Sequence, residues 1–241
     1  MDFVIVLQRI YKADACKAAH NNQKSPIARI MAVLSKIPLA TISLIVINAA
    51  VFAIGFLTDS QSQIIRDYGF IPESLFNAGL TDFNNQSGDN GFLSSLLRMF
   101  TSMFIHANIA HIAFNLAALA YMGGFAEKAI GIPRYLSVYF LSGMFAAFFH
   151  GIIASYLLNN GQVLLVWASG AISGILGMSA ALGNRQAYYW LIFQIVFAFL
   201  GSVSSIPIAF TAHVGGFIAG VILTKVLVMV GHTKNTIEKE R

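Results

Sequence analysis

Six apolar segments alternate with polar stretches along this chain of 241 residues. Most are close to 20 residues long, and a helix of that length, rising about 1.5 Å per residue, crosses a hydrocarbon core of roughly 30 Å. Long unbroken apolar runs favour helices over strands. The pattern predicts an all-α polytopic membrane protein, a bundle of six transmembrane helices at Ile37–Leu57, Asn108–Ala126, Tyr135–Leu158, Ser169–Leu182, Tyr188–Val203 and Thr211–Val230.

The stretches around these helices define the expected organisation. A polar tail, 1–36, precedes a membrane domain, 37–230, and a short tail, 231–241, follows it. One long loop, 58–107, separates the first two helices, and loops of that length are usually functional or disordered. Its short apolar runs predict helices partly embedded in the membrane. Asn85 begins a glycosylation-type triplet in this loop, although such triplets are common by chance.

Composition and charge refine this interpretation. Apolar residues make up 57% of the chain and charged residues 10%, as expected of a membrane protein. The single cysteine, Cys16, has no intrachain disulfide partner. Of the fifteen Lys and Arg residues, all but Arg66 and Arg98 fall on one predicted side, so we expect both termini in the cytoplasm, at the cell membrane of a prokaryote. The net charge of +5 is therefore a topology signal, and no nucleic acid partner is expected.

The fourth apolar segment is too short to cross the membrane, and it begins with a serine. If Arg185 marks the far interface, Ser169 lies about 24 Å from it, inside the hydrocarbon region. The preceding residues, Leu164–Trp167, must then enter the membrane to meet the helix. Non-helical backbone at that depth is tolerated only where it is buried in protein or lines a water-filled cavity. Ser169 is therefore a candidate reactive residue.

Other polar side chains gather at the same predicted depth. His111 and Asn115 are four residues apart and share one helix face, and His106 lies just before that helix. His213 is at the outer end of the sixth helix, about as far from the inner boundary as Ser169 and His111. Intramembrane polar groups are expensive and functional by default. The alternative is that the polar groups of the second helix only hydrogen-bond one another.

Glycine faces offer a way to bring the serine and His213 together. The fourth helix carries Gly170, Gly174 and Gly177, and the sixth carries Gly216 and Gly220. Such faces let two helix backbones approach closely. Two other polar residues are read differently: a lone intramembrane His150 is interpreted as a packing residue, and Gln194 as part of a scaffold or gate.

These residues permit serine chemistry. His213 can act as general base on Ser169 because imidazole titrates near physiological pH. The Ser169 N–H, His111 and Asn115 can supply hydrogen-bond donors to an oxyanion. We expect a Ser–His dyad, since no acid accompanies His213 at membrane level. We expect neither a metal nor a cofactor, and the absence of HExxH excludes a zincin-type zinc site. A transporter is the weaker alternative, because no inverted repeat is visible.

At this point the sequence resembles the rhomboid intramembrane serine proteases, over roughly 98–230. The match rests on R-x-x-T-x-x-F-x-H-x(4)-H-x(3)-N from Arg98, S-G-A-I-x-G from Ser169, A-H-x-x-G-x-x-x-G from Ala212, and E-x(3)-G from Glu127. The resemblance implies a serine endopeptidase that cleaves transmembrane or juxtamembrane segments of membrane proteins. It also implies these roles: Ser169 as nucleophile, His213 as base, His111 and Asn115 in the oxyanion hole, and His106, Arg98, Glu127, Gly170, Gly174, Gly216 and Gly220 as supporting residues.

Two positions depart from the family pattern. Trp167 replaces the first glycine of G-x-S-G, and Ser173 stands where many members carry an aromatic that stacks on the catalytic histidine. Inactive relatives exist in the wider superfamily, typically without the serine or the histidine. The alternative function is therefore a catalytically silent rhomboid-like protein that binds transmembrane segments in quality control or trafficking.

Trp167 generates a prediction about specificity. An indole beside the nucleophile fills volume that a glycine leaves open, so we expect Trp167 to restrict the residue before the cut to Ala, Gly or Ser. Trp167→Gly should raise cleavage after larger residues by about tenfold to a few hundredfold, since pocket changes of this size are worth about 1–3 kcal/mol. The measurement is kcat/KM over a substrate series varied at that residue, and an unchanged preference refutes the idea.

Overall fold

The computed structural model describes residues 37–77, 92–157, 161–162, 164–166, 168–203 and 210–239. Four features from the sequence lie outside these residues: the tail 1–36 with Cys16, the Asn85 triplet, Leu158 at the predicted end of the third helix, and Trp167. Within the described part, the regular structure is helical apart from one isolated antiparallel bridge between Phe70 and Leu165.

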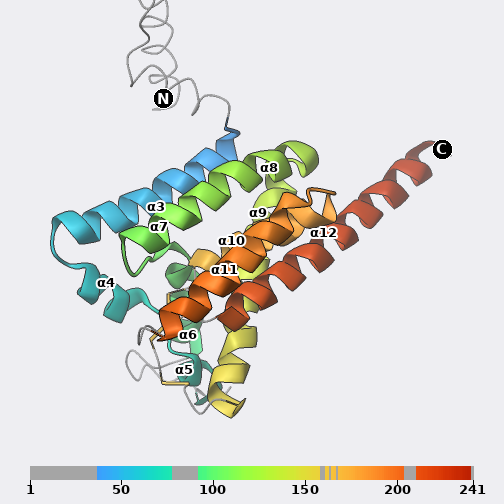
Figure 1. The fold of residues 1–241 in the computed structure, drawn as a ribbon. Helices are drawn as coiled ribbons and strands as arrows, with labels where there is room; N and C mark the ends of the chain where they lie inside the picture. Colours follow the sequence, from blue (N-terminus) through green and yellow to red (C-terminus); the bar gives the residue numbers. More distant parts are fainter. Residues whose placement is uncertain are drawn as a thin grey trace, which may run out of the picture.

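All six predicted helical segments are present (Figure 1). The second runs through a π-helical turn, and the third ends in one. Their bounds are α3 (Leu39–Leu57), α7 (Ile109–Ala118) continued by η4 (Leu119–Gly123) and α8 (Gly124–Ile130), α9 (Ile132–Ile152) continued by η5 (Ile153–Leu157), α10 (Ala168–Ala181), α11 (Gln186–Val203) and α12 (Phe210–Lys239).

Three boundaries differ from the sequence prediction by three residues or more. The second helix ends at Ile130 rather than Ala126. The third helix begins at Ile132 rather than Tyr135, because Gly131, with φ 79°, ends α8 and Pro133 suits the first turn of α9. The sixth helix does not end at Val230 but continues to Lys239. The residues after Val230 are polar and still helical. Hydropathy located the end of the apolar surface, which is not the end of the helix.

The helices are those of an integral membrane protein. Among the described residues, four are long and apolar enough to cross a bilayer: Leu39–Leu57, Ile109–Ile130, Ile132–Leu157 and Phe210–Val230. α10 is not among them, because its 14 residues extend over only about 21 Å. As predicted, the helix that begins beside Ser169 is shorter than the hydrocarbon core.

The described parts of the loop after α3 contain short helices, as its apolar runs predicted. These are α4 (Gln61–Tyr68), α5 (Pro72–Asn77), α6 (Phe92–Thr101) and the 3₁₀ turn η3 (Ser102–Phe104). Two side chains of α6 hold α4 in place. The Arg98 guanidinium donates to the Arg66 carbonyl at 3.0 Å, and the Thr101 hydroxyl donates to the Tyr68 carbonyl at 2.8 Å.

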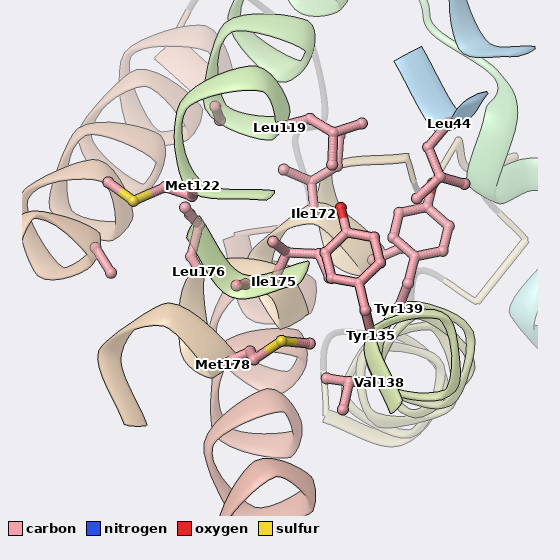
Figure 2. Close-up of a cluster of buried hydrophobic side chains, with 14 of the residues drawn as sticks. Leu44, Leu119, Met122, Tyr135, Val138, Tyr139, Ile172, Ile175, Leu176 and Met178 are labelled. Carbon is pink, nitrogen blue, oxygen red and sulfur yellow. The ribbon is translucent and has the colours of Figure 1, made fainter. Parts of the chain in front are cut away.

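α10 is the central helix of the bundle, and it packs against both α9 and α12. Residues 168–180 are all buried, although surface helices normally expose one face. Figure 2 shows the largest side chains of this core, in which Tyr135 and Tyr139 of α9 lie beside the isoleucines of α10. The labelled members are Leu44, Leu119, Met122, Tyr135, Val138, Tyr139, Ile172, Ile175, Leu176 and Met178.

Glycines let α10 and α12 meet backbone to backbone. A Cβ on Gly216 would collide with the carbonyl of Gly170, and a Cβ on Gly220 with the carbonyl of Gly174. From α10, a Cβ on Gly177 would collide with the carbonyl of Phe217. The residue numbers rise together along this contact, so the two helices run parallel. Gly174 also has a second role, because its own missing Cβ faces Ser142 of α9 rather than α12.

A buried carboxylate joins the first helix to the second. Glu127 of α8 accepts the backbone N–H groups of Ala40 and Thr41 at 2.9 and 2.7 Å, and the Thr41 hydroxyl lies 2.7 Å from the same carboxylate. The N-cap residue of α3, Pro38, makes no side-chain cap. Glu127, 4% exposed, therefore satisfies N–H groups that have no acceptor within the helix.

The glycine contact makes a prediction about stability. Gly220→Ala should lower the melting temperature in detergent, because the added methyl has only the α10 backbone to displace; overpacking of this kind costs about 1–3 kcal/mol. Gly124→Ala is the matched control, since a Cβ there meets Pro38 at an ordinary 3.4 Å. Equal melting temperatures for the two variants would contradict the proposed close contact.

Candidate active site

Ser169 and His213 lie in hydrogen-bond contact at the N-terminal ends of two neighbouring helices. The Ser169 Oγ is 2.8 Å from the His213 Nε2, although the residues are 44 apart in sequence. Ser169 is in the first turn of α10 and His213 in the first turn of α12. The two side chains are 7% and 6% exposed. The structure thus brings together the nucleophile and base candidates that the sequence predicted.

Small residues allow this contact. Gly170, next to the serine, faces Ala146 of α9, and a Cβ there would lie 3.0 Å from the Ala146 methyl. Gly216, one turn after the histidine, faces Ala146 as well as Gly170. Three helices therefore meet at the level of Ser169 with almost no side-chain volume between them.

The other ring nitrogen of His213 has no fixed partner. Its Nδ1 is buried, and no hydrogen-bonding group within the described residues reaches it. A neutral imidazole that accepts the serine proton at Nε2 carries its own proton at Nδ1. In a triad an acid would hold that Nδ1 proton. The geometry therefore resembles a dyad, within the part of the chain that the structure describes.

The start of α7 sets the orientation of His111. Asn108, expected inside the second helix, is instead its N-cap, and its side chain accepts the backbone N–H of His111 at 2.9 Å. The His111 Nδ1 in turn accepts the backbone N–H of Ala107 over a long 3.4 Å. An Nδ1 that accepts leaves the proton on Nε2. His111 thus presents an N–H donor on a helix that packs against α10.

Asn115 lies one turn further along α7. It is 3% exposed, and its side-chain nitrogen, Nδ2, is buried without a hydrogen-bond partner in the described residues. Buried polar groups are normally satisfied, and an exception needs an explanation. An amide donor left free in this position is suited to a charge that forms only during a reaction.

His106 packs against His111. It is fully buried, and its ring meets the ring of His111 edge to face at 5.2 Å between centroids. Its carbonyl oxygen accepts a hydrogen bond of 2.6 Å from the side-chain amide of Gln61 in α4. The structure therefore places His106 between the loop helices and His111, in a supporting position.

The segment before Ser169 is extended where the structure describes it. Leu165 exchanges two backbone hydrogen bonds with Phe70, at 2.8 and 2.9 Å. Phe70 is fully buried, so this bridge anchors the long loop to the strand-like stretch that leads to the serine. The sequence predicted irregular backbone here, and the bridge with the loop was not foreseen.

Two polar contacts near the site were also missed. Ser173 donates to the Gln194 side chain of α11 at 2.8 Å, and His150 of α9 hydrogen-bonds Thr211 of α12. Each residue was considered alone in the sequence, where a single polar residue in an apolar helix gives no sign of its partner. The spacing of Thr211, two residues before His213, was the available signal.

Known proteins are similar to this chain over part of its length. The family model of the Rhomboid domain matches residues 93–230. Rhomboid protease AarA of Providencia stuartii is 31% identical over 157 residues, which cover 54% of this chain and 56% of that protein. Rhomboid protease GluP of Bacillus subtilis is 35% identical over 132 residues, 51% of this chain and 24% of its own length. RHOMBOID-like protein 7 of Arabidopsis thaliana is 33% identical over 134 residues, 52% of this chain and 41% of that protein.

The fold and site define a helical membrane protein with a serine and a histidine in contact at two buried helix ends. The chain belongs to the Rhomboid family, since the family model covers more than half of its length. The matched regions span 56% or less of these three relatives.

Proposed function

We propose that this chain is an intramembrane serine endopeptidase that cleaves transmembrane or juxtamembrane segments of membrane proteins. The observation that supports it most strongly is the 2.8 Å contact between Ser169 Oγ and His213 Nε2. Activation of a serine by an adjacent base is what acyl transfer requires. The relatives named proteases support the same activity.

The proposed reaction proceeds in two halves. Ser169 Oγ attacks the scissile carbonyl while His213 Nε2 takes its proton, and the tetrahedral intermediate collapses as His213 returns that proton to the leaving amine. Water then attacks the acyl-serine with His213 again as base, which releases the new carboxyl terminus and the free serine.

Three donors are suited to the oxyanion in each half. The Ser169 N–H lies in the first turn of α10, where backbone N–H groups have no acceptor in the helix. The Nε2–H of His111 and the free Nδ2 of Asn115 add two more. Donors held in a low-dielectric site stabilise developing charge without reorganisation.

The substrates that fit this site are membrane-embedded. Both reacting side chains are buried at helix ends, and α10 is too short to reach across the bilayer. A helical peptide bond hides its carbonyl, so the substrate must unwind at the cut. We propose that both termini are cytoplasmic and that the reaction takes place in the cell membrane of a prokaryote, because the positive charges gather on one side.

The dyad is tested by substitution. Ser169→Ala and His213→Ala should each abolish cleavage of single-span proteins in liposomes, and the double variant should be scarcely worse, because the two residues act as a unit. A fluorophosphonate probe should label wild type and not Ser169→Ala. A folded wild-type protein that binds transmembrane segments without cleaving them or reacting with the probe would instead be the catalytically silent relative.

A substitution at Asn115 tests catalysis separately from stability. Asn115→Ala should lower kcat by about 10²–10³, the usual loss for one oxyanion donor. Its melting temperature should change little, because the removed Nδ2 has no partner to lose. Full activity in Asn115→Ala would exclude this residue from the oxyanion site.

A further inference from the structure

A polar contact joins α9 to the first turn of α12, two residues before His213. The His150 Nδ1 and the Thr211 Oγ1 are hydrogen-bonded across 61 residues of sequence. His150 is 7% exposed, and its partner Thr211 lies two residues before His213. A buried polar side chain in an apolar helix is costly unless it is hydrogen-bonded, and the part-buried Thr211 supplies the partner of His150.

Among the described residues, a single hydrogen bond holds the His213 ring. Its Nε2 contacts Ser169, and its Nδ1 has no hydrogen-bond partner in the described residues. Ser173, one turn after Ser169, has no ring to stack on the imidazole, and its hydroxyl is engaged with Gln194. The position of the imidazole therefore depends on the backbone of α12 at its first turn.

That turn is the weakest part of a helix, because its N–H groups lack intrahelical acceptors and helix ends open first. α9 packs against α12 directly after this turn. Gly215 faces the ring of Phe149, and Gly216 faces the methyl of Ala146. The hydrogen bond between His150 and Thr211 belongs to the same α9–α12 contact, and it lies at the start of α12.

We propose that His150 and Thr211 form a positioning pair that holds the first turn of α12, and with it the His213 imidazole, at hydrogen-bond distance from Ser169. The inference rests on the proposed protease function for its effect on rate. Neither residue is catalytic: both act through the backbone that bears the base. A displacement of about 1 Å in a reacting group can cost about 10² in rate, which sets the scale of the effect.

The test uses Thr211→Val, which keeps the shape of the side chain and removes the hydroxyl. We expect a 10- to 100-fold loss of kcat with KM nearly unchanged, and the same loss in the rate of fluorophosphonate labelling. Thr211→Ser should restore both rates. His150→Leu should give a similar loss, and the double variant His150→Leu/Thr211→Val should be little worse than either single variant, since both remove one interaction.

Thr224→Val is the matched control. Thr224 is a buried threonine of the same helix, whose hydroxyl donates to the Gly220 carbonyl at 2.7 Å, far from the site. It should keep the wild-type kcat even if it melts at a lower temperature. Hydrogen exchange of the amides in residues 210–216 supplies a readout independent of activity, and it should accelerate in Thr211→Val and not in Thr224→Val.

The outcomes separate this inference from the proposed function. Wild-type kcat or unchanged exchange in Thr211→Val overturns the positioning pair, whether or not the other readout moves. An equal loss of kcat in Thr224→Val also overturns it, because the effect would then be general destabilisation. If the wild type neither cleaves nor reacts with the probe, the proposed function fails, and hydrogen exchange alone decides whether His150 and Thr211 hold the turn.

Discussion

The structure depends on how closely α10 and α12 approach each other. In a bilayer, lipid tails are as apolar as leucine, so helices associate by packing and hydrogen bonds rather than by the hydrophobic effect. Here Gly216 and Gly220 lie directly against the carbonyls of Gly170 and Gly174. Because the two helices run parallel in this register, their first turns coincide, and the 2.8 Å contact between Ser169 and His213 follows from the backbone geometry.

Further polar groups lie around the Ser169–His213 contact that the glycines allow. His111 is held by the N-cap and backbone at the start of α7, His106 lies behind it, and the free Nδ2 of Asn115 is buried nearby. α9 contributes Ala146 to the packing and His150 to the first turn of α12. Helices α7, α9, α10 and α12 thus all contribute polar groups to a site that no single helix could form.

Much of this was predictable from the sequence, and the reasons are physical. Hydropathy located all six helical segments, because lipid-facing surface must be apolar, and the short α10 followed from the distance between Ser169 and Arg185. The glycine faces predicted the meeting of Ser169 with His213. The pairs Ser173–Gln194 and His150–Thr211 were not predictable, since a partner on a distant helix leaves no local pattern. Hydropathy also could not show that α12 continues past Val230, because it measures apolar character and gives no signal for a polar helix.

The carboxylate of Glu127 has a consequence for the order in which the chain assembles. The amides of Ala40 and Thr41 are synthesised 87 and 86 residues before the group that accepts them. Until α8 has entered the membrane, those amides depend on water at the interface, because hydrocarbon offers no acceptor. The amides of Ala40 and Thr41 therefore gain a protein acceptor only when α8 packs beside α3. Packing of α8 against α3 is in this sense the step that completes the hydrogen bonding at the start of the first helix.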